Sequence, residues 1–288
     1  ARQSLLPQLV PPGTFTNALT WNSSIFQVAT VAGPALGGLL LLGLGYTRLC
    51  LLEALFEMVF FALALAVRTS PRAFRREPVS LRSLLSGFRF VRDNRLVLAT
   101  ITMDLFVVVL GGATALLPAF SSDILRCGAV GYGFLQAAMP AGAFGMALLL
   151  AHRPPMRRAG RSLLWAVAGF GLATVVFGLS RSYWLSFLAL AVAGALDNVS
   201  VIVRSTLVQV LTPDAMRGRV TAVSYIFIHS SNELGGFESG ATAALLGPVG
   251  SVVLGGLGSV LVVLAVARIW PEVARFGALE KAGRKGRS

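Results

Sequence analysis

The sequence predicts an all-α fold, a polytopic helical membrane protein with eight transmembrane helices. Of its 288 residues, 55% are hydrophobic and only 13% are charged, and the mean hydropathy is +0.75. Apolar segments long enough to cross a bilayer, which takes roughly 17 to 25 residues, recur between short polar breaks. Basic residues gather in alternate breaks. Together these patterns exclude an ordinary soluble domain.

The breaks between the helices fall at glycine and proline clusters and at arginines. The predicted spans, in order, lie near residues 14–44, 46–67, 96–120, 130–151, 162–179, 184–210, 220–246 and 249–269. Several exceed the length that a bilayer requires, so we expect tilts, or kinks at Pro34, Pro118 and Pro140.

Lysine and arginine set the orientation, because short cytoplasmic loops retain them and translocated loops do not. Most of the 25 Lys and Arg lie in alternate segments, while the opposite loops hold only Arg48, Arg126 and Arg181. We therefore expect both ends of this chain to be cytoplasmic. The asymmetry also accounts for the net charge of +13, so we predict no nucleic-acid partner.

An internal repeat links the two ends of the sequence. Identical residues recur 202 positions apart, the difference between 33 and 235. The matching pairs are Leu9 and Leu211, Pro11 and Pro213, Gly33 and Gly235, Gly38 and Gly240, and Leu44 and Leu246. Parallel repeats of this kind build transporters with two similar halves. On this basis we expect four further helices to precede Ala1.

Four stretches carry a resemblance to a known family. They are GPALGG at 33–38, AHRPPMRR at 151–158, and RSTLVQVLTPDAMRGRV at 204–220 with SNELGGFESG at 231–240. The chain resembles the major facilitator superfamily over essentially its whole length, and within it the branch that includes the enterobactin exporter. The first stretch is similar to the end of an antiporter motif, although Thr20 and Ala29 stand where that motif has glycines. The second is similar to a basic cytoplasmic loop, with His152 where an acid is common.

The resemblance implies six plus six helices, of which this chain supplies helices five to twelve. The implied parts are the last two helices of the N-terminal half (1–67), a cytoplasmic linker with an amphipathic helix (68–95), the C-terminal six-helix half (96–270) and a basic cytoplasmic tail (271–288). We expect the helix-packing motif to consist of Gly33, Pro34, Gly37 and Gly38, whose small size lets helices approach.

The later part of the linker shows helical amphipathicity. Apolar residues recur at helical spacing opposite three arginines, the apolar set being Leu81, Leu84, Leu85, Phe88 and Val91 and the basic set Arg82, Arg89 and Arg92. This pattern predicts a helix in the membrane interface. It serves either as a simple anchor or in sensing lipids.

Charged residues inside the spans are the main functional signal, because each costs about 2.5 to 3.5 kcal/mol at the bilayer centre. Asp197 and Arg204 lie seven positions apart on one helical face, and Asp104 reaches a depth similar to that of Arg204. We therefore predict an ion pair between Asp104 and Arg204. The resemblance places these residues on the helices that line the central cavity. A structural bridge and a substrate or gating role both remain open.

The eleventh helix of the implied fold holds the predicted proton-coupling residues. Glu233 lies at its centre, where an ionised carboxylate is most costly, and His229 precedes it by one turn on the same face. We predict Glu233 as the proton carrier, with Asp104 second and His229 as a relay. The alternative is that Glu233 only forms a hydrogen bond with the neighbouring half.

Further polar residues are predicted to line the substrate cavity together with Arg204. They are Gln136, Asp197, Asn198, Asn232 and Glu238. For the amides, hydrogen bonds between helices are the competing interpretation.

Function follows by elimination and by resemblance. The sequence has no metal-ligand spacing, no nucleophile elbow and no P-loop, so we predict no enzyme activity and no cofactor, and an ion gradient as the energy source. Together with the resemblance, these features predict proton-coupled export of a small amphipathic molecule, such as a siderophore or drug. The transporter is predicted to be a monomer in the lipid bilayer. Uptake or uniport by the same fold, or a non-transporting membrane scaffold, are the alternatives.

Overall fold

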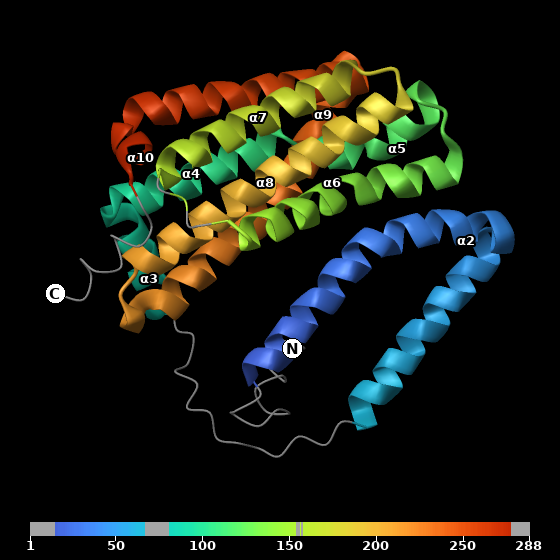
Figure 1. Ribbon diagram of the computed structural model, residues 1–288, viewed down its shortest axis with the longest axis horizontal. Helices are drawn as coiled ribbons and strands as arrows, with labels where there is room; N and C mark the ends of the chain where they lie inside the picture. The colour runs from blue at the N-terminus through green and yellow to red at the C-terminus, as the bar shows by residue number, and fades with distance from the viewer. Residues whose placement is uncertain (1–14, 67–80, 154–155, 157, 278–288) are drawn as a thin grey trace. The chain divides into compact units, whose positions relative to one another are not determined.

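The computed structural model describes residues 15–66, 81–153, 156 and 158–277. Within these residues every regular element is a helix (Figure 1). Six helices are long and apolar enough to cross a membrane. Two of the six bend back on themselves, which is consistent with the eight predicted crossings. The chain divides into two compact units, the first taking residues up to 78 together with 128–137 and the second taking the rest.

In the first unit, helix α2 (Phe15–Ala66) consists of two legs that meet at Gly45. Gly45 has φ 70° and ψ 170°, a backbone conformation that is essentially restricted to glycine. The two legs run in opposite directions (Figure 1). The bend falls between the two predicted spans, whereas Pro34 lies inside the first leg, which continues as a helix.

Helix α9 (Asp214–Ile269), in the second unit, has the same construction. Its bend is at Gly247, with φ 76° and ψ 164°, and Pro248 follows directly. Across the bend the hydroxyl of Ser251 donates to the carbonyl oxygen of Ser239 at 3.0 Å, which ties the two legs together. Gly45 and Gly247 are separated by the predicted repeat distance, so the repeat is present in the backbone as well as in the sequence.

The span predicted over 96–120 is present as one crossing over Arg95–Ile124, but several short helices build it, and its irregular part includes Pro118, where a kink was expected. Helix α4 (Arg95–Leu110) stops at Gly111 and is followed by the 3-10 helix η2 (Ala113–Leu116), the short helix α5 (Leu117–Ala119) and the π-helix η3 (Phe120–Ile124). Two causes combine here. Gly112 packs directly against Ser239 of α9, where no side chain would fit, and Pro118 lacks the N–H that a regular helix would use.

The core of the second unit lies between α4, α8 (Tyr183–Leu211), α7 (Ala159–Leu179) and α9. Its fully buried side chains include Met103, Leu163 and Val203. Helices approach closely where glycines meet, as at Gly171 of α7 and Gly256 of α9. Helix α6 (Gly128–Ala151) completes the set of spans, and Pro140 lies inside it without ending it.

Helix α3 (Leu81–Asp93) forms as predicted, but its apolar face is divided between protein and surroundings. Val91 is buried in a cluster with Val220 and Val223 of α9, and Gly87 packs against the backbone of α9. Leu85 and Phe88 stay exposed. The predicted amphipathic pattern also includes Leu81, Arg82 and Leu84, whose side chains the structure does not describe. Helix α3 is thus attached to the bundle along one side and open along the other.

The described part of the chain ends with the short helix α10 (Pro271–Arg275), which packs by Val273 against the start of α7. Most of the predicted basic tail, from residue 278 onward, lies outside the described residues.

Candidate functional site

The predicted ion pair between Asp104 and Arg204 is confirmed. Asp104 comes from α4 and Arg204 from α8, and the guanidinium Nη1 contacts the carboxylate Oδ1. Their neighbours in sequence, Met103 and Val203, are fully buried in the core, so the two charged side chains emerge at its edge facing one another. Only 11% of the Asp104 side chain and 12% of the Arg204 side chain are exposed. The pair neutralises two charges that would otherwise be costly inside an apolar bundle.

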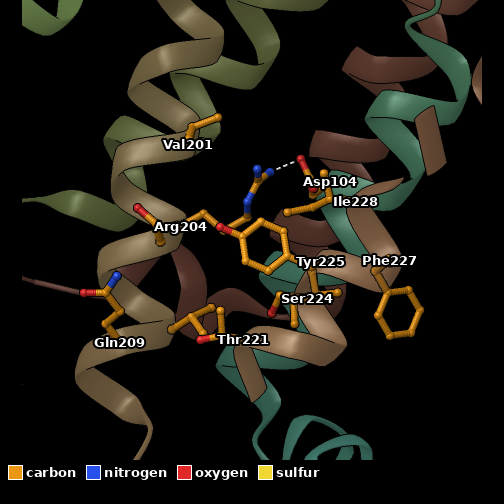
Figure 2. A pocket seen from close by; sticks show the side chains of 12 residues that line it. Asp104, Val201, Arg204, Gln209, Thr221, Ser224, Tyr225, Phe227 and Ile228 are labelled. Carbon is orange, nitrogen blue, oxygen red and sulfur yellow. Dashed lines mark ion pairs between the residues drawn. The ribbon is translucent and has the colours of Figure 1, made fainter. Parts of the chain in front are cut away.

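A cavity of about 260 Å³ opens beside this pair, between α4, α8 and the first leg of α9. Figure 2 shows the Arg204 side chain reaching across to Asp104, with the ring of Tyr225 next to the pair. Polar groups reach the cavity from two helices, namely Ser205 and Gln209 of α8 and Thr221, Ser224 and Tyr225 of α9. Val201 and Ile228 supply apolar wall. A cavity with mainly apolar walls and a few polar groups suits a small amphipathic ligand.

A stripe of three residues leads from this cavity along α9. Tyr225 lines the cavity and its ring stacks on the imidazole of His229, with centroids 6.3 Å apart. Glu233 follows one turn later, and both His229 and Glu233 are exposed. The described residues provide no hydrogen bond or ion pair between His229 and Glu233. Residues four apart share a helical face, so the stripe connects the cavity with the middle of the helix.

Glu233 points away from the packed side of α9. Gly235, which packs against the backbone of Val108 and Val109 in α4, defines that side. Glu233 is two residues away, which places it about 160° around the helix. The described residues of the second unit therefore leave its carboxylate uncovered.

The structure places the other predicted cavity residues apart from the cavity around Arg204. Asp197 is half-buried two turns before Arg204, and Asn198 has a buried side-chain oxygen that finds no hydrogen-bond partner within the described residues. Glu238 accepts a hydrogen bond of 2.7 Å from the hydroxyl of Thr242, one turn on. Asn232 and Gln136 are exposed.

Of the three glycines in the predicted packing motif, one packs closely against another helix of the first unit. A Cβ atom on Gly38 would lie 2.7 Å from the carbonyl oxygen of Ala129 in α6, and Gly133 of α6 packs in turn against the carbonyl of Pro34. Gly33 and Gly37 have nothing within 4 Å of a Cβ atom. Gly38 is therefore the position at which the helices need a small residue.

Five polar residues that line the cavity were not predicted from the sequence, namely Ser205, Gln209, Thr221, Ser224 and Tyr225. The available signal was their spacing, because Thr221, Ser224 and Tyr225 are three and four positions apart and precede His229 by a turn or two. No group of three His, Cys, Asp or Glu side chains within the described ranges could hold a metal ion.

A bundle of apolar spans with a buried ion pair beside an open cavity is typical of multi-pass membrane transporters. A family model described as transmembrane secretion effector matches residues 1–282. The chain belongs to this family, within the major facilitator superfamily. Proteins of this superfamily are transporters, which confirms the prediction that the chain is not an enzyme.

Curated relatives include enterobactin exporters EntS from Escherichia coli O81 (strain ED1a), Shigella boydii serotype 18 and Escherichia fergusonii. Each is 29% identical over 252 residues, covering 87% of this chain and 60% of the relative. The chain thus spans less than two thirds of the length of these relatives. A solved structure of a bacterial homologue of the human lysosomal transporter Spinster matches with a TM-score of 0.55 and 17% identity. It covers 98% of this chain and 73% of that protein, and shows the fold alone.

Proposed function

We propose that this chain forms helices five to twelve of a secondary active transporter that exports a small amphipathic molecule in exchange for protons. The two legs of α2 would be the last helices of the N-terminal half, and α4 to α9 would be the C-terminal half. The equivalent bends at Gly45 and Gly247 support this assignment, because they relate the last two helices of each half. The transporter would act as a monomer in a bacterial cytoplasmic membrane, with both ends of this chain cytoplasmic.

The Asp104–Arg204 pair at the cavity wall is the observation that carries this proposal. A paired carboxylate and guanidinium in an apolar bundle can separate only if another group neutralises each charge. A proton neutralises Asp104, and an anionic group of the substrate neutralises Arg204. Proton uptake and substrate binding can therefore act on the same ion pair, which is the basis of coupling.

The stripe from Tyr225 through His229 to Glu233 supports a proton path that ends in this cavity. Its groups follow one another at single turns of α9, and the first of them lines the cavity. Glu233 is then the carrier and His229 a relay. In the alternative, Glu233 forms a hydrogen bond with the other half, which would leave Asp104 as the coupling acid.

The substrate is proposed from the cavity and from the relatives. Mainly apolar walls with hydroxyl, amide and guanidinium groups suit an amphipathic molecule that carries a negative or hydrogen-bonding group. The names of the relatives favour a siderophore over a drug. Uptake and uniport use the same fold, whereas a non-transporting scaffold has no use for the buried pair.

The test is proton-coupled transport by the full-length protein in vesicles that contain a pH-sensitive dye. We expect enterobactin, the molecule that the relatives are named for, to cause proton movement in the wild type and none in Asp104→Asn. Asp123→Asn is the matched control, because Asp123 is an exposed acid in η3 away from the cavity. Substrate movement without proton movement would indicate uniport. No movement of either would contradict the proposal.

A further inference from the structure

A second cleft lies on the other side of the cavity wall. It has a volume of about 170 Å³ and lies between α3, α4 and α9. Its apolar lining consists of Phe88 and Val91 of α3, Leu98, Ile101 and Leu105 of α4, and Phe227 of α9. Thr102 adds a hydroxyl group and Arg92 a charge.

Ile101 and Phe227 line both this cleft and the cavity beside Arg204, so they form the wall between the two spaces. Figure 2 shows the ring of Phe227 pointing away from Arg204. On the far side this ring stacks on Phe88 at 6.5 Å between centroids. The cleft is therefore a separate site, with its own opening beside α3.

A basic surface adjoins the cleft. An open hollow along α3 is lined by Leu85, Ser86, Phe88, Arg89 and Arg92, so it shares Phe88 and Arg92 with the cleft. Asp93 is the acid beside these arginines, with 3.6 Å between Arg92 Nε and Asp93 Oδ1. Both side chains are more than half exposed, and such a surface ion pair contributes little. Arg92 can therefore turn to another anion.

We propose that this cleft and hollow bind one anionic phospholipid, with part of an acyl chain between α3 and α4 and the phosphate on Arg89 and Arg92. The chain spans a membrane, so lipid surrounds it. An apolar cleft with two arginines at its mouth complements a negative headgroup joined to a hydrocarbon chain. A zwitterionic choline lipid would bring a cation towards the same arginines and should bind less well.

Native mass spectrometry of the purified full-length protein, titrated with phosphatidylglycerol, tests this site. We expect Arg89→Gln/Arg92→Gln to weaken binding of the tightest lipid roughly thirtyfold, about fivefold for each arginine. Arg268→Gln/Arg275→Gln is the matched control, because it removes two exposed arginines outside the cleft and should leave that binding unchanged. Thr102→Phe fills the cleft, keeps every charge, and should also displace the lipid.

Three results would overturn the proposal. Equal losses in the two double variants would show that phosphatidylglycerol responds only to overall charge. Equal binding of phosphatidylcholine would show that the arginines do not select the headgroup. Displacement of the lipid by inorganic phosphate alone, with no effect of Thr102→Phe, would show an anion site without a place for the acyl chain.

Discussion

Two residues, Asp104 and Arg204, set the chemistry of the cavity. Each follows a fully buried neighbour, Met103 or Val203, which fixes the backbone at that position. The two charged side chains therefore face one another and form an ion pair. Their pairing could be predicted from the sequence because an apolar span tolerates a charge only when something neutralises it. Tyr225 could not be predicted in the same way. A tyrosine is compatible with lipid, protein or cavity, and only the packing of α9 against α4 decides which it meets.

Removing one member of the pair should destabilise the protein strongly. We expect Arg204→Leu to cost about 3 to 5 kcal/mol, because Asp104 would remain as an uncompensated, largely buried charge. The same cost is expected for Asp104→Leu. Thermal unfolding of the detergent-solubilised protein, followed by intrinsic fluorescence, measures this loss.

The double variant Asp104→Leu/Arg204→Met separates charge from packing. Because apolar residues of similar size often replace a buried pair without loss, we expect it to unfold at a higher temperature than either single variant. A double variant as unstable as the singles would mean that the pair contributes through shape. A stable single variant would show that the charges are solvated.

At the scale of helices, the bends at Gly45 and Gly247 decide how the chain crosses and returns. The sequence places both bends between predicted spans, because glycine and proline interrupt the apolar pattern there. The end of α4 at Gly111 was not predicted from that pattern, which indicated a kink only at Pro118. It depends on Gly112 and Gly255 approaching other helices, with a Cβ atom on Gly112 blocked by Ser239, and such contacts exist only after the bundle has formed.

Replacing Gly247 by alanine should strain the bend of α9. An alanine has to adopt φ 76° and ψ 164°, a region that costs of order 1 to 3 kcal/mol. Gly240→Ala is the control in the same helix, since a Cβ atom there meets nothing within 4 Å and alanine favours a helix. Thermal unfolding should show a loss for Gly247→Ala and no loss for Gly240→Ala. Equal melting temperatures would mean that the bend tolerates side chains.

The first unit offers a comparable test at neighbouring glycines. We expect Gly38→Leu to destabilise by about 1 to 3 kcal/mol, the usual cost of overpacking, because Gly38 packs against Ala129 and Gly133. A Cβ atom on Gly37 has nothing within 4 Å among the described residues. Gly37→Leu should therefore have little effect on stability. Fluorescence-detected size-exclusion chromatography after heating compares the two variants. A greater loss for Gly37→Leu would mean that a different face of α2 is packed.

On the scale of the whole molecule, the repeat and the family membership give the architecture. The repeat could be predicted because glycines and prolines recur at matching positions, and the two bends have similar dihedral angles. The proposed role of the exposed stripe on α9, which consists of Tyr225, His229 and Glu233, depends on the whole transporter. Among the described residues, no helix of the second unit covers the side of α9 that carries Glu233, so the proposed role of Glu233 can be tested only in the full-length transporter.

Substituting glutamine for Glu233 tests the proposed proton path in the full-length transporter. Glutamine keeps the shape of glutamate and most of its hydrogen bonds but cannot ionise, so a pure packing role should survive the change. If Glu233 carries protons, accumulation driven by a proton gradient is lost while downhill exchange of substrate continues. Glu57→Gln is the control, because Glu57 is an exposed acid in the second leg of α2. Export that keeps its pH dependence in Glu233→Gln would exclude Glu233 as the carrier and leave Asp104, at the cavity wall, as the acid that couples proton movement to substrate.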